Sequence, residues 1–221
     1  MILEAVDIQL DIDGRTALRS QSVVCRPSVM TALVGPSGSG KTTLLNCLGL
    51  MQKPTSGQVL LEGVDTTSWG DARRRRFWRD HASFVLQDYG IMLEESVAFN
   101  VTMVSSLWGR RVGGDVQRMR RALAMTGLQA REDELAAHLS GGERQRLGIA
   151  RSIYRDATVL LVDEPTASLD IANRDRVIEL LQERARQGCT LVVASHDPVL
   201  IEACDVQHLV AAHDVAPVMA S

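Results

Sequence analysis

The chain has 221 residues, of which 45% are hydrophobic and 23% charged, and its formal net charge is -3. These values fit an ordinary globular protein of one large domain or two small ones, and they do not favour a general affinity for nucleic acid or anionic membranes. No apolar run approaches the roughly 20 residues that span a bilayer, and the acidic start is not typical of a signal peptide, so we expect a cytoplasmic protein.

Short strands and helices alternate along the first half of the chain. The strands that we predict here are residues 2–12, 22–26, 30–34, 57–62 and 83–86. Asp13-Gly14 is a turn signal that favours a hairpin after the first of these strands. A helix is expected from Lys41 to about Leu50, stopped by Pro54.

The second half begins with a long helical stretch. From about Ser96 to Arg155 the apolar residues follow a helical spacing. Strands return at residues 158–162 and 190–194 with a helix between them, and this β–α–β order predicts a parallel sheet with right-handed crossovers. We therefore predict one α/β domain over residues 1–221, with a helical segment of approximately residues 90–156 inserted into it.

A glycine-rich loop joins the predicted strand at residues 30–34 to the helix that begins at Lys41. Glycines let backbone N–H groups curl around an anion, and the start of the helix adds partial positive charge. Lys41 can reach the β- and γ-phosphates of a nucleotide, and Thr42 can offer its hydroxyl to Mg2+. A glycine-rich turn without a ligand is the alternative. The candidate phosphate ligands are Gly35, Pro36, Ser37, Gly38, Ser39, Gly40, Lys41, Thr42 and Thr43.

Two carboxylates, Asp163 and Glu164, end a strongly apolar strand. Open α/β sheets bind their ligands at this edge of the strands. A carboxylate there can hold Mg2+, and its neighbour can orient and deprotonate an attacking water. An acidic pair at a strand end can also be a simple polar boundary.

A second helix start carries the sequence Leu139-Ser-Gly-Gly-Glu-Arg-Gln-Arg146. Ser140 is a good N-cap, and Gly141 and Gly142 leave backbone donors open to an anion. These features predict a further phosphate-binding helix terminus, with a simple helix cap as the alternative.

The order of these motifs resembles the ATP-binding subunit of an ATP-binding-cassette (ABC) transporter. The Leu-Ser-Gly-Gly motif lies between the phosphate-binding loop and the segment Leu160–Glu164, and the resemblance runs from Leu3 to about His213. It implies a P-loop NTPase (RecA-like) core with an antiparallel β subdomain and an inserted α-helical subdomain. It also implies the hydrolysis of ATP with Mg2+.

The resemblance assigns expected roles to single residues. Glu164 would be the general base, and Gln87 would contact Mg2+ and the attacking water. His196 would touch the γ-phosphate, while Thr42 and Asp163 would hold Mg2+. Asp170 would belong to a loop that crosses to the opposite nucleotide site.

Two kinds of protein partner follow from the same resemblance. Subunits of this family form head-to-tail dimers in which Ser140, Gly141 and Gly142 of one chain contact the nucleotide of the other. A transmembrane permease would hold the pair at the cytoplasmic face of the cell membrane, without a role for nucleic acid. The segments Phe84–Tyr89 and Glu94–Val101 look most like ATPases of the lipoprotein-releasing, macrolide-export and bacteriocin-export type, so we expect an exporter.

Other functions of the same motifs stay open from the sequence. A nucleotide-switched module that regulates a membrane complex without transport is the main alternative. A soluble ABC ATPase that acts on DNA or ribosomes is disfavoured, because the chain has no second cassette and no coiled-coil or zinc insertion. The cargo and the permease leave no trace in this sequence.

One segment departs from the family pattern. Family members usually carry an aromatic residue in the first strands, on which adenine stacks, but Leu10–Gly14 has none. Ile12 offers an apolar contact instead, so we expect weak recognition of the base.

Three further features have mainly structural interpretations. Arg73–Arg79 is interpreted as a solvated helix. The cysteines are expected to be reduced and mostly buried. Ile91 and Leu93 suit either a groove for a partner's helix or the packing of the helical insertion.

Overall fold

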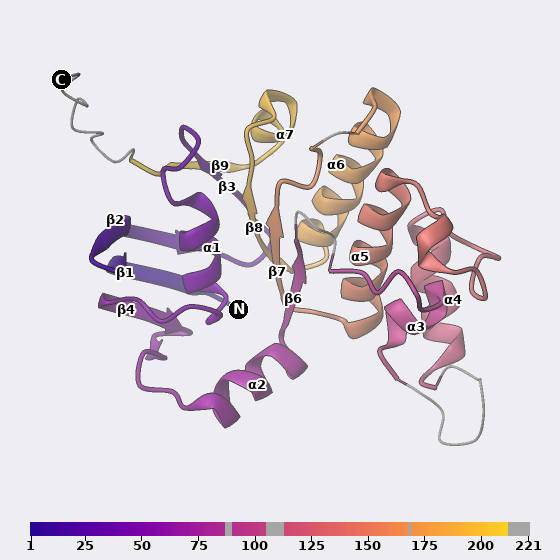
Figure 1. Ribbon diagram of the computed structural model, residues 1–221, viewed down its shortest axis with the longest axis horizontal. Coiled ribbons are helices and arrows are strands. Elements are labelled where there is room, and N and C mark those ends of the chain that lie inside the picture. The colour runs from indigo at the N-terminus through magenta and orange to yellow at the C-terminus, as the bar shows by residue number, and fades with distance from the viewer. Residues whose placement is uncertain (87–89, 105–112, 168, 212–221) are drawn as a thin grey trace.

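The computed structural model describes residues 1–86, 90–104, 113–167 and 169–211, and it shows two sheets and a group of helices (Figure 1). One sheet is antiparallel, in the order β2 (Arg15–Cys25), β1 (Leu3–Ile12), β4 (Ser56–Leu61) and β5 (Val64–Asp65). The other is parallel, in the order β6 (Ala82–Val85), β7 (Val159–Asp163), β8 (Thr190–Ala194), β3 (Met30–Val34) and β9 (Val206–Leu209). The predicted α/β class, parallel core and antiparallel β subdomain are confirmed.

Helix α1 (Lys41–Leu48) lies between the two sheets and joins them into one core (Figure 1). Its buried residues Leu44, Leu45 and Leu48 pack with Leu3 of the antiparallel sheet and Leu161 of the parallel sheet. Helix α6 (Ile171–Arg186) covers the other face of the parallel sheet. Successive residues of a strand point to opposite faces of the sheet. The side chains of β7 therefore pack alternately in the core around α1 and in the core around α6.

A separate cluster of helices occupies the chain between β6 and β7. It contains α3 (Val97–Thr102), α4 (Val116–Met125), a 3-10 turn (Ala136–His138) and α5 (Gly141–Arg155). Val101, Leu123 and Leu147, one from each of the three helices, are fully buried in its core. None of the helices in the described residues combines the length and apolar composition that crossing a bilayer requires.

The remaining helices are α2 (Asp71–Asp80) and α7 (Pro198–Glu202). Helix α2 buries Phe77, whereas Arg73, Arg75, Arg76 and Arg79 are exposed, so the prediction of a solvated helix is confirmed.

Two predicted boundaries differ from the structure by two residues or more. The second strand begins at Arg15 instead of Ser22, because the turn at Asp13 and Gly14, both at positive φ, returns the chain directly onto β1. Helix α1 ends at Leu48, since Gly49 caps it and Leu50 takes a left-handed φ of 57°. A side chain at Gly49 would lie 2.5 Å from the ring of Phe84, so the close packing of α1 on β6 requires glycine there.

The exposure of the side chains tests the expectations for the cysteines and for Ile91 and Leu93. The four cysteines are free thiols, three of them buried and Cys204 half-buried, as predicted. Ile91 packs against the helical cluster, whereas Leu93 stays 38% exposed.

Candidate functional site

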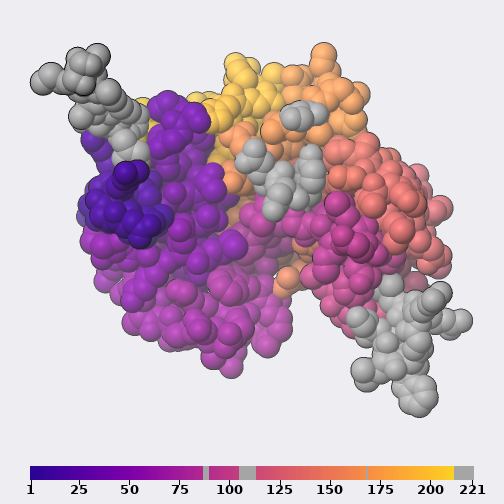
Figure 2. Space-filling model, in the orientation of Figure 1, coloured from indigo at the N-terminus to yellow at the C-terminus, as the bar shows by residue number. Residues whose placement is uncertain are grey.

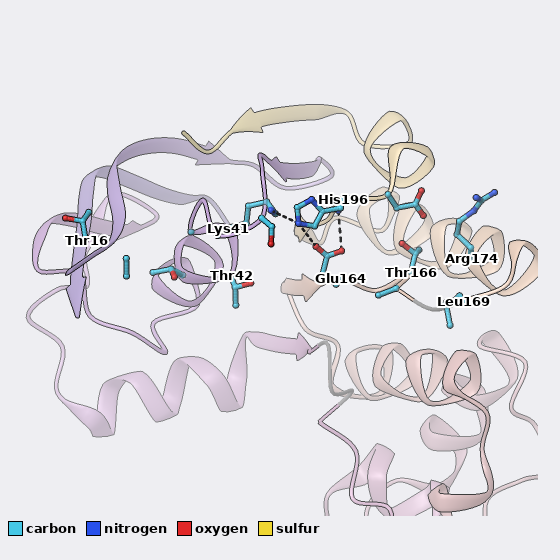
Figure 3. Close-up of a pocket in the computed structure, with 15 residues that line it drawn as sticks. Thr16, Lys41, Thr42, Glu164, Thr166, Leu169, Arg174 and His196 are labelled. Atoms are coloured by element: carbon cyan, nitrogen blue, oxygen red, sulfur yellow. Dashed lines mark hydrogen bonds and ion pairs between the residues drawn. The ribbon is translucent and has the colours of Figure 1, made fainter. Parts of the chain in front are cut away.

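The carboxyl ends of three neighbouring strands bring distant motifs together. In the parallel register Leu33 of β3 and Asp163 of β7 both pair with Ala194 of β8. The glycine-rich loop, Glu164 and His196 therefore emerge at one edge of the sheet, which is where open α/β sheets bind ligands. They surround a cavity of about 1000 Å³ (Figure 3).

The glycine-rich loop is shaped by close approaches of backbone to backbone. A Cβ at Gly35 would lie 2.5 Å from the carbonyl oxygen of Val210, and a Cβ at Gly40 would lie 2.8 Å from that of Ala17. Both glycines have positive φ. Gly40 caps α1 without a side-chain hydrogen bond. The first N–H groups of the helix thus lack a side-chain cap and face the cavity as anion donors.

Lys41 lies beneath this loop, with 6% of its surface exposed. Its ammonium donates to the carbonyl oxygens of Gly35 (2.9 Å) and Pro36 (3.1 Å) and to Nε2 of His196 (2.9 Å). All three protons of the ammonium are thereby used. Burial lowers the pKa of Lys41 below its usual value, although the charges of Glu164 and Asp163 oppose this.

The Thr42 side chain in the cavity lining and the Asp163 carboxylate at the end of β7 bring two oxygen donors together. The Thr42 hydroxyl donates to Oδ1 of Asp163 across 3.2 Å. Burial raises the pKa of Asp163, and the hydrogen bond from Thr42 opposes this rise. Adjacent ligands of an octahedral Mg2+ lie about 2.9 Å apart, because each Mg–O distance is about 2.0–2.1 Å. The spacing and the oxygen chemistry of this pair therefore fit Mg2+.

Glu164 is held in a left-handed backbone conformation, with φ of 46°. Its amide donates to the carbonyl of Ala194 (2.9 Å), which fixes this turn against β8. Its carboxylate accepts from the Ser195 hydroxyl (3.4 Å) and the His196 amide (3.3 Å). Such a conformation costs about 1–3 kcal/mol for a residue other than glycine, and it is typical of functional sites.

His196 lies between Lys41 and Glu164 (Figure 3). Because the Lys41 ammonium can only donate, Nε2 of His196 accepts and the ring carries its proton on Nδ1. Oε1 of Glu164 lies 3.6 Å from the same nitrogen, and the imidazole side chain is 49% exposed. His196 can therefore turn toward a ligand in the cavity without disturbing the core.

Ser140 starts α5 with a capping box. Its hydroxyl accepts from the Glu143 amide (3.4 Å), and the Glu143 carboxylate accepts from the Ser140 amide (2.7 Å). Within the described part of the chain, Ser140, Gly141 and Gly142 do not line the cavity. The second predicted anion-binding helix terminus is thus separate from the first one in the same chain.

The cavity unites part of the predicted set and adds residues that the motifs did not indicate. The predicted residues in its lining are Ser37, Gly38, Gly40, Lys41, Thr42, Thr43, Glu164 and His196. The added ones are Thr16, Ala17, Thr166, Ala167, Leu169, Arg174 and Asp197. The predicted residues outside the lining include Gly35, Pro36, Ser39, Asp163 and Asp170, which is the N-cap of α6; Gln87 lies outside the described residues.

Two residues of β2, Thr16 and Ala17, enter the lining because β2 starts earlier than predicted. A longer alternation extended back to the Asp13-Gly14 turn would have found them. Arg174 stands four residues after Asp170 with no motif of its own, so the sequence carries no signal for it.

Comparison with known proteins gives a consistent result. Residues 18–167 match the family model described as ABC transporter. The lipoprotein-releasing system ATP-binding protein LolD 1 of Rhodospirillum rubrum is 36% identical over 189 residues, which cover 85% of this chain and 84% of that protein. The macrolide export ATP-binding/permease protein MacB of Salmonella choleraesuis is 34% identical over 89% of this chain and 30% of its own length.

Solved structures agree with the fold. The chain superposes with a TM-score of 0.82, at 26% identity and over 94% of both chains, on the dimeric bacterial ABC transporter cassette MJ0796. The same values hold for the dimeric post-hydrolysis state of that cassette with bound ADP and Pi.

Proposed function

This chain belongs to the ABC transporter family, whose ATP-binding, ATP-hydrolysing cassette it contains, and we propose that it dimerises head to tail on ATP and powers a separate transmembrane permease as an exporter. The pair would sit at the cytoplasmic face of the cell membrane through that permease. The exporter direction is supported by the similarity to lipoprotein-releasing and macrolide-export proteins.

One observation carries the proposed dimer. Each chain has two helix termini that are predicted to bind an anion, at Lys41 and at Gly141, and of these two the first opens into the cavity. Ser140 at the second terminus is exposed. A second chain can bring its own α5 terminus over the cavity, and a two-fold (isologous) pairing, in which each chain does this for the other, gives two such sites. The test of this arrangement is the pair of variants argued in the Discussion.

In the proposed reaction water attacks the γ-phosphate in line. Glu164 accepts the proton of the water, and His196 contacts the γ-phosphate. The backbone N–H groups of the loop from Gly35 to Thr43, together with Lys41, stabilise the charge that develops on the phosphate oxygens. The partner's Ser140 to Gly142 would complete this shell, with Gln87 orienting the water and Asp170 reaching the opposite site.

Lys41 has to exchange partners when ATP binds. In this structure one N–H of the Lys41 ammonium donates to His196, and this N–H turns toward the phosphates of ATP. The exchange frees Nε2 of His196 at the same moment and leaves the imidazole able to follow Lys41 toward the γ-phosphate. Binding of ATP is thus coupled to the position of the histidine.

Mg2+ is the proposed cofactor of this reaction, held by Thr42 and Asp163 and, in the family pattern, by Gln87. When bound, it supplies positive charge to the phosphate oxygens of ATP. Among the described residues no cluster of three or more carboxylates, histidines or cysteines forms a metal cage. One carboxylate and one hydroxyl are sufficient here, because Mg2+ usually takes its remaining ligands from phosphates and water.

The permease would dock beside the helical cluster. Figure 2 shows the surface hollowed between α2 and the segment around α3. Leu93, near the start of α3, keeps an exposed apolar side chain, while its carbonyl accepts from the Ala137 amide (3.0 Å). The similarity of the chain to 30% of an ATP-binding/permease protein supports a permease outside the cassette.

Leu93→Asp should weaken co-purification with the permease by at least tenfold while leaving ATP hydrolysis by the isolated protein unchanged. A charge at the centre of an apolar contact has to be desolvated, which costs more than the roughly 1.4 kcal/mol that corresponds to tenfold in affinity. The measurement is the amount of membrane protein retained on tagged cassette. Val24→Asp, at a similarly exposed apolar position on β2, is the control. Equal retention by the two variants would remove Leu93 from the interface.

Selectivity for adenine should be weak. Ile12 is 44% exposed and lines a shallow hollow with Arg15 and Ala17, and Ala17 also borders the main cavity. An aromatic partner would add about 0.5–1.5 kcal/mol of stacking, or about two- to tenfold in affinity. ATP and GTP carry the same triphosphate, so the phosphate contacts do not distinguish them. The two nucleotides should therefore bind with similar affinity.

Competitive binding of ATP and GTP measures this selectivity. Ile12→Tyr should tighten ATP by about two- to tenfold if the new ring stacks on the base. Val24→Tyr adds the same ring on the antiparallel sheet and should change nothing. A preference of the unmodified chain for ATP above about thirtyfold, roughly 2 kcal/mol, would mean that another residue reads the base.

A further inference from the structure

Asn173 joins the starts of two helices that belong to different motifs. It is the third residue of α6, whose N-cap is Asp170, and it packs against the first turn of α5, whose N-cap is Ser140. The motifs themselves give no role to this residue.

The side chain of Asn173 uses both ends of its amide. Its Nδ2 donates to Oδ2 of Asp170 (2.7 Å), and its backbone N–H donates to Oδ1 of the same carboxylate (2.9 Å). Its Oδ1 accepts from Nη1 of Arg146 in α5. Arg146 in turn donates through Nε to the carbonyl of Thr126 at the end of α4 (3.0 Å). The orientation of Asp170 is therefore coupled to α5 through one amide.

Gly142, in the first turn of α5, packs directly against the side chain of Asn173. A Cβ built on Gly142 would lie 2.8 Å from Cγ and 2.9 Å from Oδ1 of Asn173. The absence of a side chain at Gly142 is what lets Asn173 reach Arg146 past the α5 terminus. The amide of Asn173 thus contacts the Leu-Ser-Gly-Gly segment by packing and Asp170 by hydrogen bonds.

We propose that Asn173 is a positioning residue that holds Ser140–Gly142 and Asp170 as one unit, so that both reach the partner's nucleotide site together. The proposal rests on the proposed head-to-tail dimer. The side-chain amide of Asn173 forms a hydrogen bond with a charged group at each end, where Asp170 accepts and Arg146 donates. Loss of the link lets the two segments move independently, and the partner's site then assembles only in a fraction of encounters.

Asn173→Ala should lower ATP turnover by about tenfold or more, the scale of losing hydrogen bonds to charged groups. ATP affinity of the monomer should stay unchanged, because Asn173 does not line that chain's own cavity. Asn173→Asp keeps the volume beside Gly142 and the acceptor for Arg146, but it replaces the donor to Asp170 by a like charge. It should show the same loss of turnover, which identifies the link to Asp170 as the one that matters.

Mixing experiments separate positioning from general damage. A chain with Asn173→Ala still has a complete phosphate-binding loop, and a chain with Lys41→Ala still has an intact α5 terminus. The mixture should regain turnover at the one site that combines the two intact parts. A merely destabilised chain would not be rescued in this way.

Each outcome decides for or against the role of Asn173. Unchanged turnover of both Asn173 variants overturns it, as does a mixture that fails to recover while Ser140→Arg mixed with Lys41→Ala does recover. If that second mixture also stays inactive, the head-to-tail dimer itself is wrong. If both Asn173 variants lose the cooperative melting transition of the unmodified chain, the residue is structural and the proposal is wrong.

Discussion

Glu164→Gln should reduce ATP turnover by about a hundred- to ten-thousand-fold, the usual contribution of a general base. The amide keeps the size of the side chain, and its oxygen can still accept from the Ser195 hydroxyl and the His196 amide. What it loses is the ability to take a proton from water. ATP should therefore bind and persist, and two chains should stay together around it.

Light scattering with ATP and magnesium measures this dimer, and phosphate release measures turnover. Asp197→Asn is the matched control, because Asp197 also lines the cavity and its Oδ1 only caps α7 by accepting from the Val199 amide (3.0 Å). The control should keep most of the turnover and show no trapped dimer. A Glu164→Gln protein that stays monomeric with ATP and magnesium would contradict the head-to-tail mechanism.

The sequence predicted the parts of the fold that follow local rules. Strands at residues 30–34 and 190–194 have the predicted bounds because each is a short apolar run flanked by turn-forming or polar residues. The meeting of the glycine-rich loop, Glu164 and His196 around one cavity also follows from sequence, since parallel strands end at one edge. Their catalytic roles stay predictions until the variants are measured.

Contacts between segments that share no motif could not be predicted from the sequence. The early start of β2 depends on its pairing with β1, and Thr16 gains its place in the cavity only through that pairing. Arg174 lines the cavity because α6 packs on the parallel sheet against β8 and β3. Asn173 is an ordinary polar residue in the first turn of a helix until Gly142 and Arg146 approach it from α5.

Ser140→Arg should abolish ATP hydrolysis while leaving ATP binding to the isolated monomer nearly intact. Ser140 is exposed and lies outside the lining of its own chain's cavity, so a large side chain there blocks only the approach of a partner's nucleotide. Loss of the capping box adds a local cost of about 0.5–2 kcal/mol to α5. Asp115→Arg changes another exposed N-cap, that of α4, and should preserve turnover.

Mixing Ser140→Arg with Lys41→Ala tests the assignment in trans. Each variant alone should be inactive, because every site of its dimer contains a defect. A mixed dimer contains one site with the intact loop of the first chain and the intact α5 terminus of the second, so turnover should reappear. Recovery requires that the α5 terminus serve the other chain's ATP, since no site formed within a single chain is complete. If Ser140→Arg loses monomer ATP affinity as severely as Lys41→Ala does, the α5 terminus acts in its own chain and the trans assignment is wrong.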